Sequence, residues 1–292
     1  MESTVSLRVS VLGAPRVDHS GATVRLSPAA VQLLAYLVIG PREGRSRRAV
    51  ASQLFGDCAE SVAKRRLATA VWRLRSELRA SVGADVIDTV TGGRIGLCDD
   101  VVIAVDALEF CEAVSPILSR PASALSPSDA DALALATDSY RGSLLESAYD
   151  EWVLEERDRL SNLYLTVLDY LIQYYGRTRR PDRLAFFATR ALELEPLRED
   201  FHRHVMQAYA DTGRVDLVER QFETCRLALL RELGADPMPE TVALYARLSS
   251  HLDGAMPDNI AALVEDLRRA RRDVRELQAL VDRAIDAVMR LR

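Results

Sequence analysis

The stretch from Glu60 to Ala80 constrains the fold more than any other part of this 292-residue chain. Four apolar residues recur in it at steps of four, three and four: Leu67, Val71, Leu74 and Leu78. This spacing predicts a helix whose apolar stripe packs against a core. Successive residues are about 100° apart around a helix, so the polar residues face the other way. They are Arg65, Thr69, Trp72, Arg73 and Ser76, flanked by Lys64 and Arg66.

The charge of the chain is divided between its two ends. Residues 1–105 contain 14 Lys and Arg against 10 Asp and Glu, whereas the remainder contains 24 against 33. Between Arg42 and Arg79 the counts are 10 basic and 4 acidic residues. This asymmetry favours a polyanionic partner for the N-terminal end. A basic helix face carrying an aromatic and a hydroxyl suits a DNA groove, but a solvated basic helix is the alternative.

Composition indicates a soluble protein of more than one domain. The chain is 48% hydrophobic and 28% charged, and its length suffices for two domains. It contains no signal-like N-terminus and no apolar run of about 18 residues, so we expect a cytoplasmic protein without a membrane partner. The cysteines Cys58, Cys98, Cys111 and Cys225 form no CxxC pair, which predicts reduced thiols and no metal site.

The first 105 residues have the element order of a winged helix-turn-helix. Short β-branched segments at Leu7–Leu12 and Val24–Leu26 predict strands. Ser27-Pro28 begins a helix through Ile39, and Ser46 caps a second helix before the basic third one. A hairpin follows, formed by Val86–Val90, the turn Thr91–Gly93 and Arg94–Leu97. In such a domain the third helix enters the major groove and the wing contacts the backbone.

The segments LRVSVLG, VWRLRSEL and GLCDD followed by VDALEF resemble the OmpR-type DNA-binding domain of the Streptomyces antibiotic regulatory proteins. The resemblance implies that Arg65, Thr69 and Trp72 read bases in direct repeats. It implies phosphate contacts for Arg47, Arg48, Lys64, Arg66, Arg73, Arg75 and Arg94. This chain departs from the family at Ala68, where a basic residue is common, and at Trp72, where a small one is usual. Alternatively, Trp72 packs against the wing and Arg75 is only solvated.

Residues 106–252 predict a helical domain. Asp106 is expected to cap a helix through Ser119, followed by helices over 129–141, 149–176, 181–195, 198–212, 215–233 and 239–251. Equivalent residues 34 apart, such as Asp182 and Asp216, are typical of tetratricopeptide-like helix pairs. Trp152, Tyr164 and Tyr209 occur in step with Leu and Val, which favours inter-helix packing over a ligand surface.

The same region extends the resemblance. The segments YRGSLLES, YDEWVLEERDRLSNLY, PLREDFHRHVMQAYADTGR and RELGADPMPETVALYARL resemble the bacterial transcriptional activation domain of that family. Together the two resemblances cover residues 5–251. They imply an activator that binds promoter DNA in pairs and contacts RNA polymerase holoenzyme in the bacterial cytoplasm, associated with the nucleoid.

Residues 253–292 carry an unbroken heptad pattern. Apolar residues alternate at steps of three and four and define a heptad seam: Ile260, Leu263, Leu267, Ala270, Val274, Leu277, Val281, Ala284, Val288 and Leu291. This pattern predicts a parallel two-stranded coiled coil, and Asp266 would lie near Arg271 of the partner helix. A larger bundle, or packing on the chain's own repeats, is the alternative.

The expected architecture is therefore mainly α: a winged helix (α+β), an all-α tetratricopeptide-like domain and a C-terminal coiled-coil helix. We find no phosphate-binding, nucleophile-elbow or metal-binding motif and expect neither enzymatic activity nor a cofactor. The leading hypothesis is a homodimeric activator that binds double-stranded promoter DNA and recruits RNA polymerase. The alternatives are a repressor of the same architecture and a protein-binding scaffold.

Overall fold

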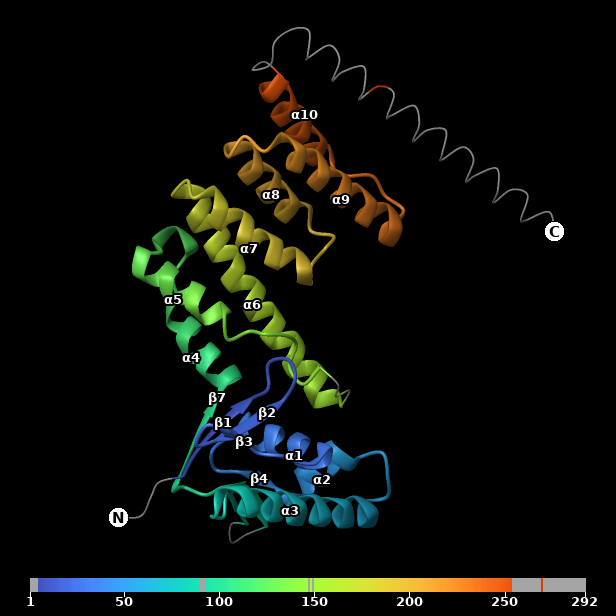
Figure 1. Cartoon of the computed structure of the whole chain (residues 1–292). Coiled ribbons are helices and arrows are strands. Elements are labelled where there is room, and N and C mark those ends of the chain that lie inside the picture. The colour runs from blue at the N-terminus through green and yellow to red at the C-terminus, as the bar shows by residue number, and fades with distance from the viewer. Residues whose placement is uncertain (1–4, 90–92, 147, 149, 254–268, 270–292) are drawn as a thin grey trace, which may run out of the picture. The chain divides into compact units, whose positions relative to one another are not determined.

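A computed structural model describes residues 5–89, 93–146, 148, 150–253 and 269, with the side chains of 251–253 excepted. The chain is mainly helical, with short strands gathered in its first 105 residues (Figure 1). Internal contacts divide it into two compact units, Met1–Arg183 and Leu184–Arg292. Each unit is described by itself.

The first unit begins with a four-stranded sheet. Its strands are β1 (Val5–Ser10), β2 (Arg16–His19), β3 (Ala22–Thr23) and β7 (Val101–Val105), in the order β3-β2-β1-β7. β1 pairs antiparallel with β2 and parallel with β7. The predicted strand at Val24–Leu26 is therefore misplaced by two residues, and β2 and β7 were not predicted. β7 completes the sheet although its residues lie 96 positions after their partners in β1.

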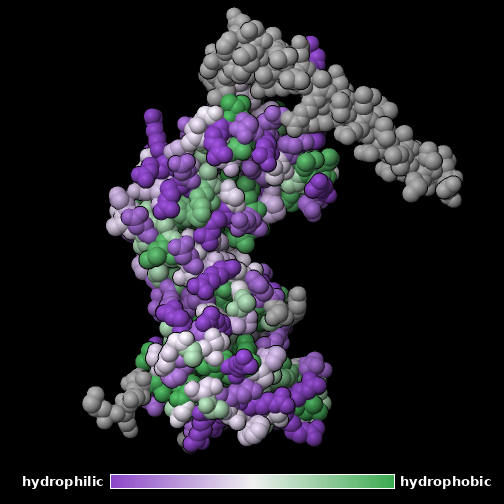
Figure 2. Space-filling model, in the orientation of Figure 1, coloured by the Kyte–Doolittle hydropathy of each residue, from purple (hydrophilic) through white to green (hydrophobic). Residues whose placement is uncertain are grey.

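Three helices pack together after this sheet. They are α1 (Pro28–Val38), α2 (Arg47–Phe55) and α3 (Glu60–Val82). Ser46 caps α2 as predicted, because its hydroxyl accepts a hydrogen bond from the Ala49 amide at 3.1 Å. α3 runs two residues beyond the predicted end and stops where Gly83 adopts a left-handed conformation with φ 80°. In the space-filling view, hydrophilic residues cover much of the edge that α3 forms (Figure 2).

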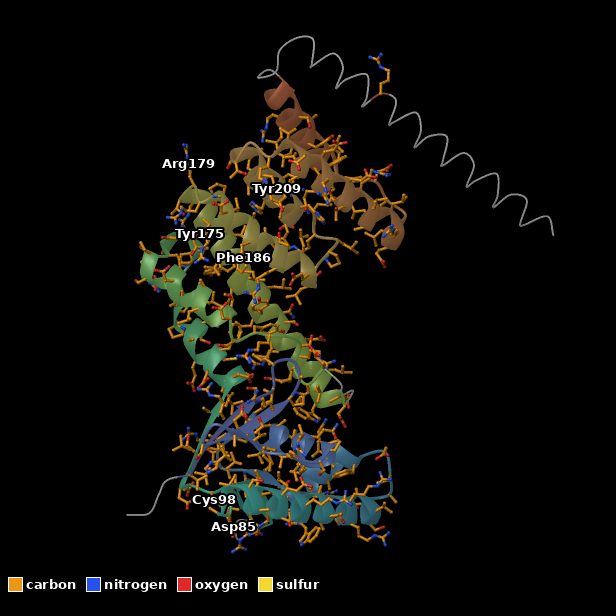
Figure 3. The ribbon with its side chains drawn as sticks, viewed as in Figure 1. Asp85, Cys98, Tyr175, Arg179, Phe186 and Tyr209 are labelled. Atoms are coloured by element: carbon orange, nitrogen blue, oxygen red, sulfur yellow. The ribbon has the colours of Figure 1, made fainter. Side chains whose placement is uncertain are left out.

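The wing is a second, three-stranded sheet. Its order is β4-β6-β5, from β4 (Arg45–Ser46), β6 (Arg94–Leu97) and β5 (Ile87–Asp88). Gly44 leads into β4 with φ 72°, and a Cβ there would lie 2.5 Å from the Ile95 carbonyl oxygen. Asp85 and Cys98 lie near the C-terminal end of α3, beside this sheet (Figure 3). The predicted wing turn at residues 91–93 lies mostly outside the described residues, but the flanking strands pair as predicted. The winged helix is thus confirmed.

Three further helices complete the first unit. They are α4 (Asp106–Leu118), α5 (Pro127–Thr137) and α6 (Glu151–Arg177), with a short 3-10 turn at Ala122–Ala124. Their core includes Tyr164, which stacks on Tyr140 with ring centroids 4.0 Å apart. The buried position of Tyr164 agrees with the predicted inter-helix packing.

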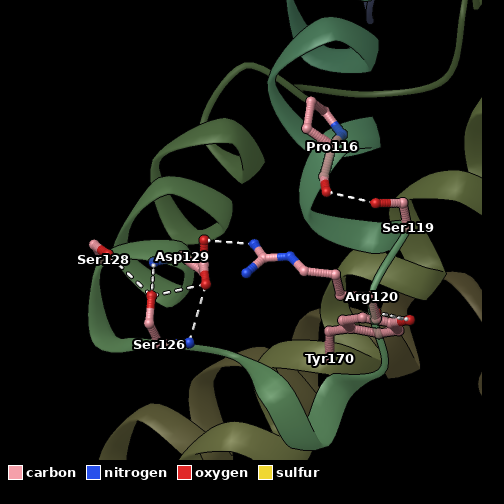
Figure 4. Close-up of polar contacts among 7 residues, drawn as sticks. All are labelled: Pro116, Ser119, Arg120, Ser126, Ser128, Asp129 and Tyr170. Carbon is pink, nitrogen blue, oxygen red and sulfur yellow. Dashed lines mark hydrogen bonds and ion pairs between the residues drawn. The ribbon is translucent and has the colours of Figure 1, made fainter.

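The start of α5 is fixed by a capping box. The Ser126 hydroxyl accepts from the Asp129 amide, and the Asp129 carboxylate accepts from the Ser126 amide (Figure 4). The Arg120 guanidinium donates to the same carboxylate at 2.8 Å. This hydrogen bond, with those from Ser126, lowers the pKa of Asp129 to about 2.

The winged helix is joined to these helices by continuous contacts. The Gly13 amide donates to the Ser143 carbonyl and the Leu145 amide donates to the Val11 carbonyl, both at 2.9 Å. Trp152 of α6 is buried and meets Tyr36 of α1 edge to face, with ring centroids 4.9 Å apart. Trp152 was predicted to pack between helices, and it does so, between α6 and α1.

Asp106 does not cap α4 in the predicted way. The N-cap residue is Val105, and Asp106 lies in the first turn with its side chain buried. Its carboxylate accepts from the amides of Val11 at 2.8 Å and Leu12 at 3.2 Å, and from that of Ala107. Asp106 therefore ties α4 to the segment that follows β1.

Arg157 of α6 is expected to be a main stabilising residue of this joint. Its guanidinium donates to the carbonyls of Leu144, Leu145 and Ala148 at 2.8 to 3.0 Å. Replacing Arg157 with Ala leaves these carbonyls without that donor and should lower the free energy of unfolding by about 1–3 kcal/mol. Urea unfolding followed by tryptophan fluorescence measures this, since both tryptophans lie in the first unit. Arg159→Ala removes an exposed pair with Glu156 and an exposed contact with Cys111 Sγ, and it should cost under about 0.5 kcal/mol. Equal losses would contradict the prediction.

The second unit contains antiparallel helices of the predicted repeat type. The unit starts at Leu184, inside α7 (Pro181–Leu194). It continues with α8 (Glu199–Asp211), α9 (Val215–Leu233) and α10 (Pro239–Asp253). Met206, Val218 and Leu248 form one buried cluster of its core, and Tyr209 packs against them. No helix in the described part of the chain is long and apolar enough to cross a membrane.

Candidate nucleic-acid interface

α3 separates a buried side from an open one, as its sequence predicts. Leu67, Leu74 and Leu78 are 0–1% exposed and Val71 is 5% exposed, so the apolar stripe packs into the winged-helix core. The Glu77 carboxylate accepts from the Ser27 amide at 2.9 Å, which ties α3 to the start of α1. The residues that the sequence places on the opposite side are all exposed: Arg65, Thr69, Trp72, Arg73 and Ser76.

The cations of this face differ in their partners. Arg65 and Arg73 have no carboxylate within ion-pair distance among the described residues. Lys64 pairs with Glu60 at 2.9 Å and Arg66 with Asp57 at 3.3 Å. These exposed pairs are worth little in water, so phosphate oxygens can replace the carboxylates at small cost. On the open face, Arg65 and Arg73 have no ion-pair partner among the described residues, and Lys64 and Arg66 can exchange their carboxylate partners for phosphates.

The pKa of Glu60 is lowered by the cations near the first turn of α3. The hydrogen bond from Lys64, and then the charges of Lys64 and Arg48, hold the pKa of this carboxyl below its usual value. Arg48, at the start of α2, is exposed. The predicted phosphate contacts Arg48 and Lys64 thus lie around one carboxylate at the α2–α3 end of the domain.

A groove runs along the other end of α3. Arg47 from α2, Trp72, Arg75 and Arg79 from α3, and Thr89 beside the wing line it. Arg75 and Arg79 share Asp85 at 3.8 and 4.0 Å, so Arg75 is not simply solvated. Arg47 is half-buried. The fold therefore brings the predicted contacts Arg47, Trp72 and Arg75 to one groove.

Arg94 has a role that sequence reasoning missed. Its Nε donates to the Glu43 carbonyl at 2.9 Å, and its Nη2 donates to the Gly44 carbonyl. The side chain therefore braces the loop before β4 against the wing. Only the rest of its exposed guanidinium is open to a phosphate.

Trp72 is 68% exposed, so it does not pack against the described part of the wing. We expect Trp72→Ala to change the free energy of unfolding by less than about 0.5 kcal/mol, because exposed side chains without special contacts contribute little. Replacing a core tryptophan costs about 3–5 kcal/mol. Urea unfolding followed by circular dichroism measures the change, and a loss in the core range would show that Trp72 is a packing residue.

The remaining predictions concern the dimer interface and metal binding. The heptad seam, from Ile260 through Leu263, Leu267, Val274, Leu277, Val281 and Val288 to Leu291, lies outside the described residues. Within the part of the chain that is described, no cluster of three or more His, Cys, Asp or Glu residues can bind a metal ion.

Comparisons with known proteins agree with this architecture. Residues 105–249 match the family described as the bacterial transcriptional activator domain. The fold is similar to a solved structure of Mycobacterium tuberculosis EmbR in complex with a low-affinity phosphopeptide. The TM-score is 0.63 at 19% identity, over 93% of this chain and 71% of that one. A search of curated proteins gave no match. Residues 105–249 of this chain therefore match the bacterial transcriptional activator domain, and in this chain they follow a winged helix.

Proposed function

We propose that this protein binds promoter DNA through α3 and activates transcription. The observation that carries the proposal is the open face of α3, where Arg65 and Arg73 have no carboxylate partner among the described residues and Trp72 is 68% exposed. A helix of this kind fits the major groove, where an arginine donates two hydrogen bonds to guanine. We assign base contacts to Arg65, Thr69 and Trp72.

Phosphate contacts are assigned to the cations that flank this face. Arg73 and Arg75 continue along α3, and Lys64 and Arg66 lie at its first turns. Arg47 and Arg48 begin α2, where the helix N-terminus adds a favourable partial charge. Arg94 contributes from the wing. These contacts position the helix on the duplex, whereas the base contacts select the sequence.

The test of DNA binding is a footprint with the full chain on the intergenic DNA next to its own gene. We expect protection of direct repeats and an affinity that falls steeply with salt, because each neutralised phosphate releases counterions. A protein-binding scaffold with an incidental basic helix would give only weak binding without discrete protected sites. That outcome would overturn the proposal.

Activation is assigned through RNA polymerase holoenzyme, reached while the protein is bound on the nucleoid in the bacterial cytoplasm. The activator-domain match over residues 105–249 supports this over repression. Transcription from a reconstituted promoter separates the two, since an activator raises the output and a repressor lowers it.

Pairing of two protomers is assigned to the heptad seam of residues 253–292. Tethering a second DNA-binding module raises the effective affinity by about 100-fold or more. We expect Leu277→Glu to shift the chain from dimer to monomer in sedimentation experiments, because a charge at a core position of a coiled coil is buried without a partner. Ala279→Glu introduces the same charge at an outward heptad position and should leave the dimer intact. A Leu277→Glu chain that remains dimeric would exclude the seam as the interface.

A further inference from the structure

The groove at the C-terminal end of α3 contains a carboxylate that binding of a phosphate backbone does not explain. Arg47, Arg75 and Arg79 line the groove together with Trp72, and Asp85 is the one acidic residue among its described lining residues. A negative charge next to a phosphate makes binding less favourable. Asp85 therefore has either a structural role or an effect on the partner.

The backbone fixes the position of Asp85. α3 is followed by Gly83 in the left-handed conformation, whose amide donates to the Arg79 carbonyl at 2.9 Å. Val86 and Ile87 then enter the core and are 1% and 0% exposed. Asp85 is held between this helix cap and these buried residues, and it is itself exposed. It therefore lies beside the last turns of α3 (Figure 3).

Asp85 contacts two arginines of α3 with its two carboxylate oxygens. Arg75 Nη2 lies 3.8 Å from Asp85 Oδ2, and Arg79 Nη1 lies 4.0 Å from Asp85 Oδ1. Arg75 and Arg79 are four residues apart, so they are neighbours on one side of the helix and their charges repel each other. Both contacts are long for ion pairs, and the three side chains are 39–70% exposed. Pairs of this kind contribute little to stability, so a structural role does not account for Asp85.

We propose, on the basis of the DNA binding proposed for α3, that Asp85 limits the affinity for DNA by competing with phosphate for Arg75 and Arg79. A phosphate that contacts either guanidinium lies within about one Debye length of the carboxylate, which is about 8 Å at physiological salt. The two anions then repel each other, and this repulsion offsets part of what the arginines contribute to binding. Asp85 is therefore a residue that opposes binding from inside the binding groove.

The effect of Asp85 is expected to be the same on every DNA sequence. Phosphates carry no sequence information, and non-specific binding is almost wholly attraction to phosphates. Of the three residues assigned to bases, Arg65 and Thr69 do not line this groove, and Trp72, which does, carries no charge. Asp85 should therefore lower the affinity for a promoter repeat and for unrelated DNA by the same factor.

The experiment is fluorescence anisotropy of the full chain with two labelled duplexes, the footprinted repeat and a scrambled duplex of the same composition. Asp85→Asn keeps the shape of the side chain and removes its charge. We expect the affinity for both duplexes to rise by the same factor, about threefold or more at about 0.1 M salt. Asp99→Asn removes the same charge between β6 and β7, outside the groove, and should raise both affinities by less than about twofold. Circular dichroism of both variants should match the wild type.

The two arginines provide a second test. In a chain with Arg75→Gln and Arg79→Gln, neither guanidinium draws a phosphate towards Asp85, so adding Asp85→Asn should raise the affinity no more than Asp99→Asn does. A wild-type chain that binds neither duplex overturns the proposed function and the role of Asp85 together. If the wild type binds the repeat and Asp85→Asn leaves the affinity unchanged, lowers it or raises it on the repeat alone, only the role of Asp85 is overturned. Equal gains with and without the two arginines also overturn it, because the effect is then one of general charge.

Discussion

Replacing Arg65 and Arg73 together with alanine should weaken specific DNA binding by at least about 100-fold. Both guanidinium groups are exposed on the open side of α3 and neither has a carboxylate partner among the described residues. No ion pair among the described residues therefore has to be broken before these two groups contact DNA. A base contact by arginine is worth about 1–3 kcal/mol, and a lost phosphate contact adds to it. Gel shifts on the footprinted repeat measure the loss.

A matched control removes the same charge from the same domain. Arg8 and Arg16 lie on the first sheet and pair with Glu109 and Asp18. Arg8→Ala with Arg16→Ala should lower the affinity by only a few fold through the general field. Circular dichroism of both double variants should match the wild type. If binding survives the Arg65 and Arg73 changes in a folded chain, α3 is not the helix that enters the groove.

Local periodicity was enough to predict the helices and the open face of α3. Leu67, Leu74 and Leu78 repeat at helical spacing, and a stripe of that kind has only one way to be buried. Ser46 was found because an N-cap is a contact between neighbours in sequence.

Features that depend on distant residues were missed. β7 is a short apolar segment whose partner residues in β1 lie 96 positions earlier, and nothing near it in sequence indicates pairing. Trp152 was correctly predicted to be an inter-helix core residue, but its spacing gave no sign that its partner is Tyr36, 116 residues earlier. Arg94 looks like a free cation at a wing, but the carbonyls it binds belong to residues 43 and 44. In each case the deciding contact joins segments that sequence patterns treat separately.

These long-range contacts all occur in the first unit, where the winged helix and helices α4 to α6 pack on one another. Asp106 lies at the point where the two parts connect, since β7 ends at Val105 and α4 begins with Asp106. Its carboxylate is the acceptor that the amides of Val11 and Leu12 share.

Asp106→Ala should therefore lower the free energy of unfolding of the first unit by about 2–4 kcal/mol, because it leaves two buried N–H groups without an acceptor. Asp131→Ala, at an exposed position of α5, should cost less than about 0.5 kcal/mol. Urea unfolding followed by tryptophan fluorescence reports on this unit. Equal effects of the two changes would show that other groups satisfy the Val11 and Leu12 amides.

The pH dependence gives a second and independent signature of Asp106. Burial raises the pKa of its carboxyl above the ordinary value of 3.8, against the opposing hydrogen bonds from Val11, Leu12 and Ala107. The folded state then binds the proton more tightly than the unfolded state. Proton binding at Asp106 therefore adds to the free energy of unfolding. This proton-linked part is fully present below pH 3.8 and is lost as the pH rises through the folded-state pKa. Asp106→Asn cannot titrate, so the stability difference between wild type and this variant should shift against the wild type as the pH rises from about 4. A difference that is flat across this range, or that changes in the opposite direction, would contradict the assignment.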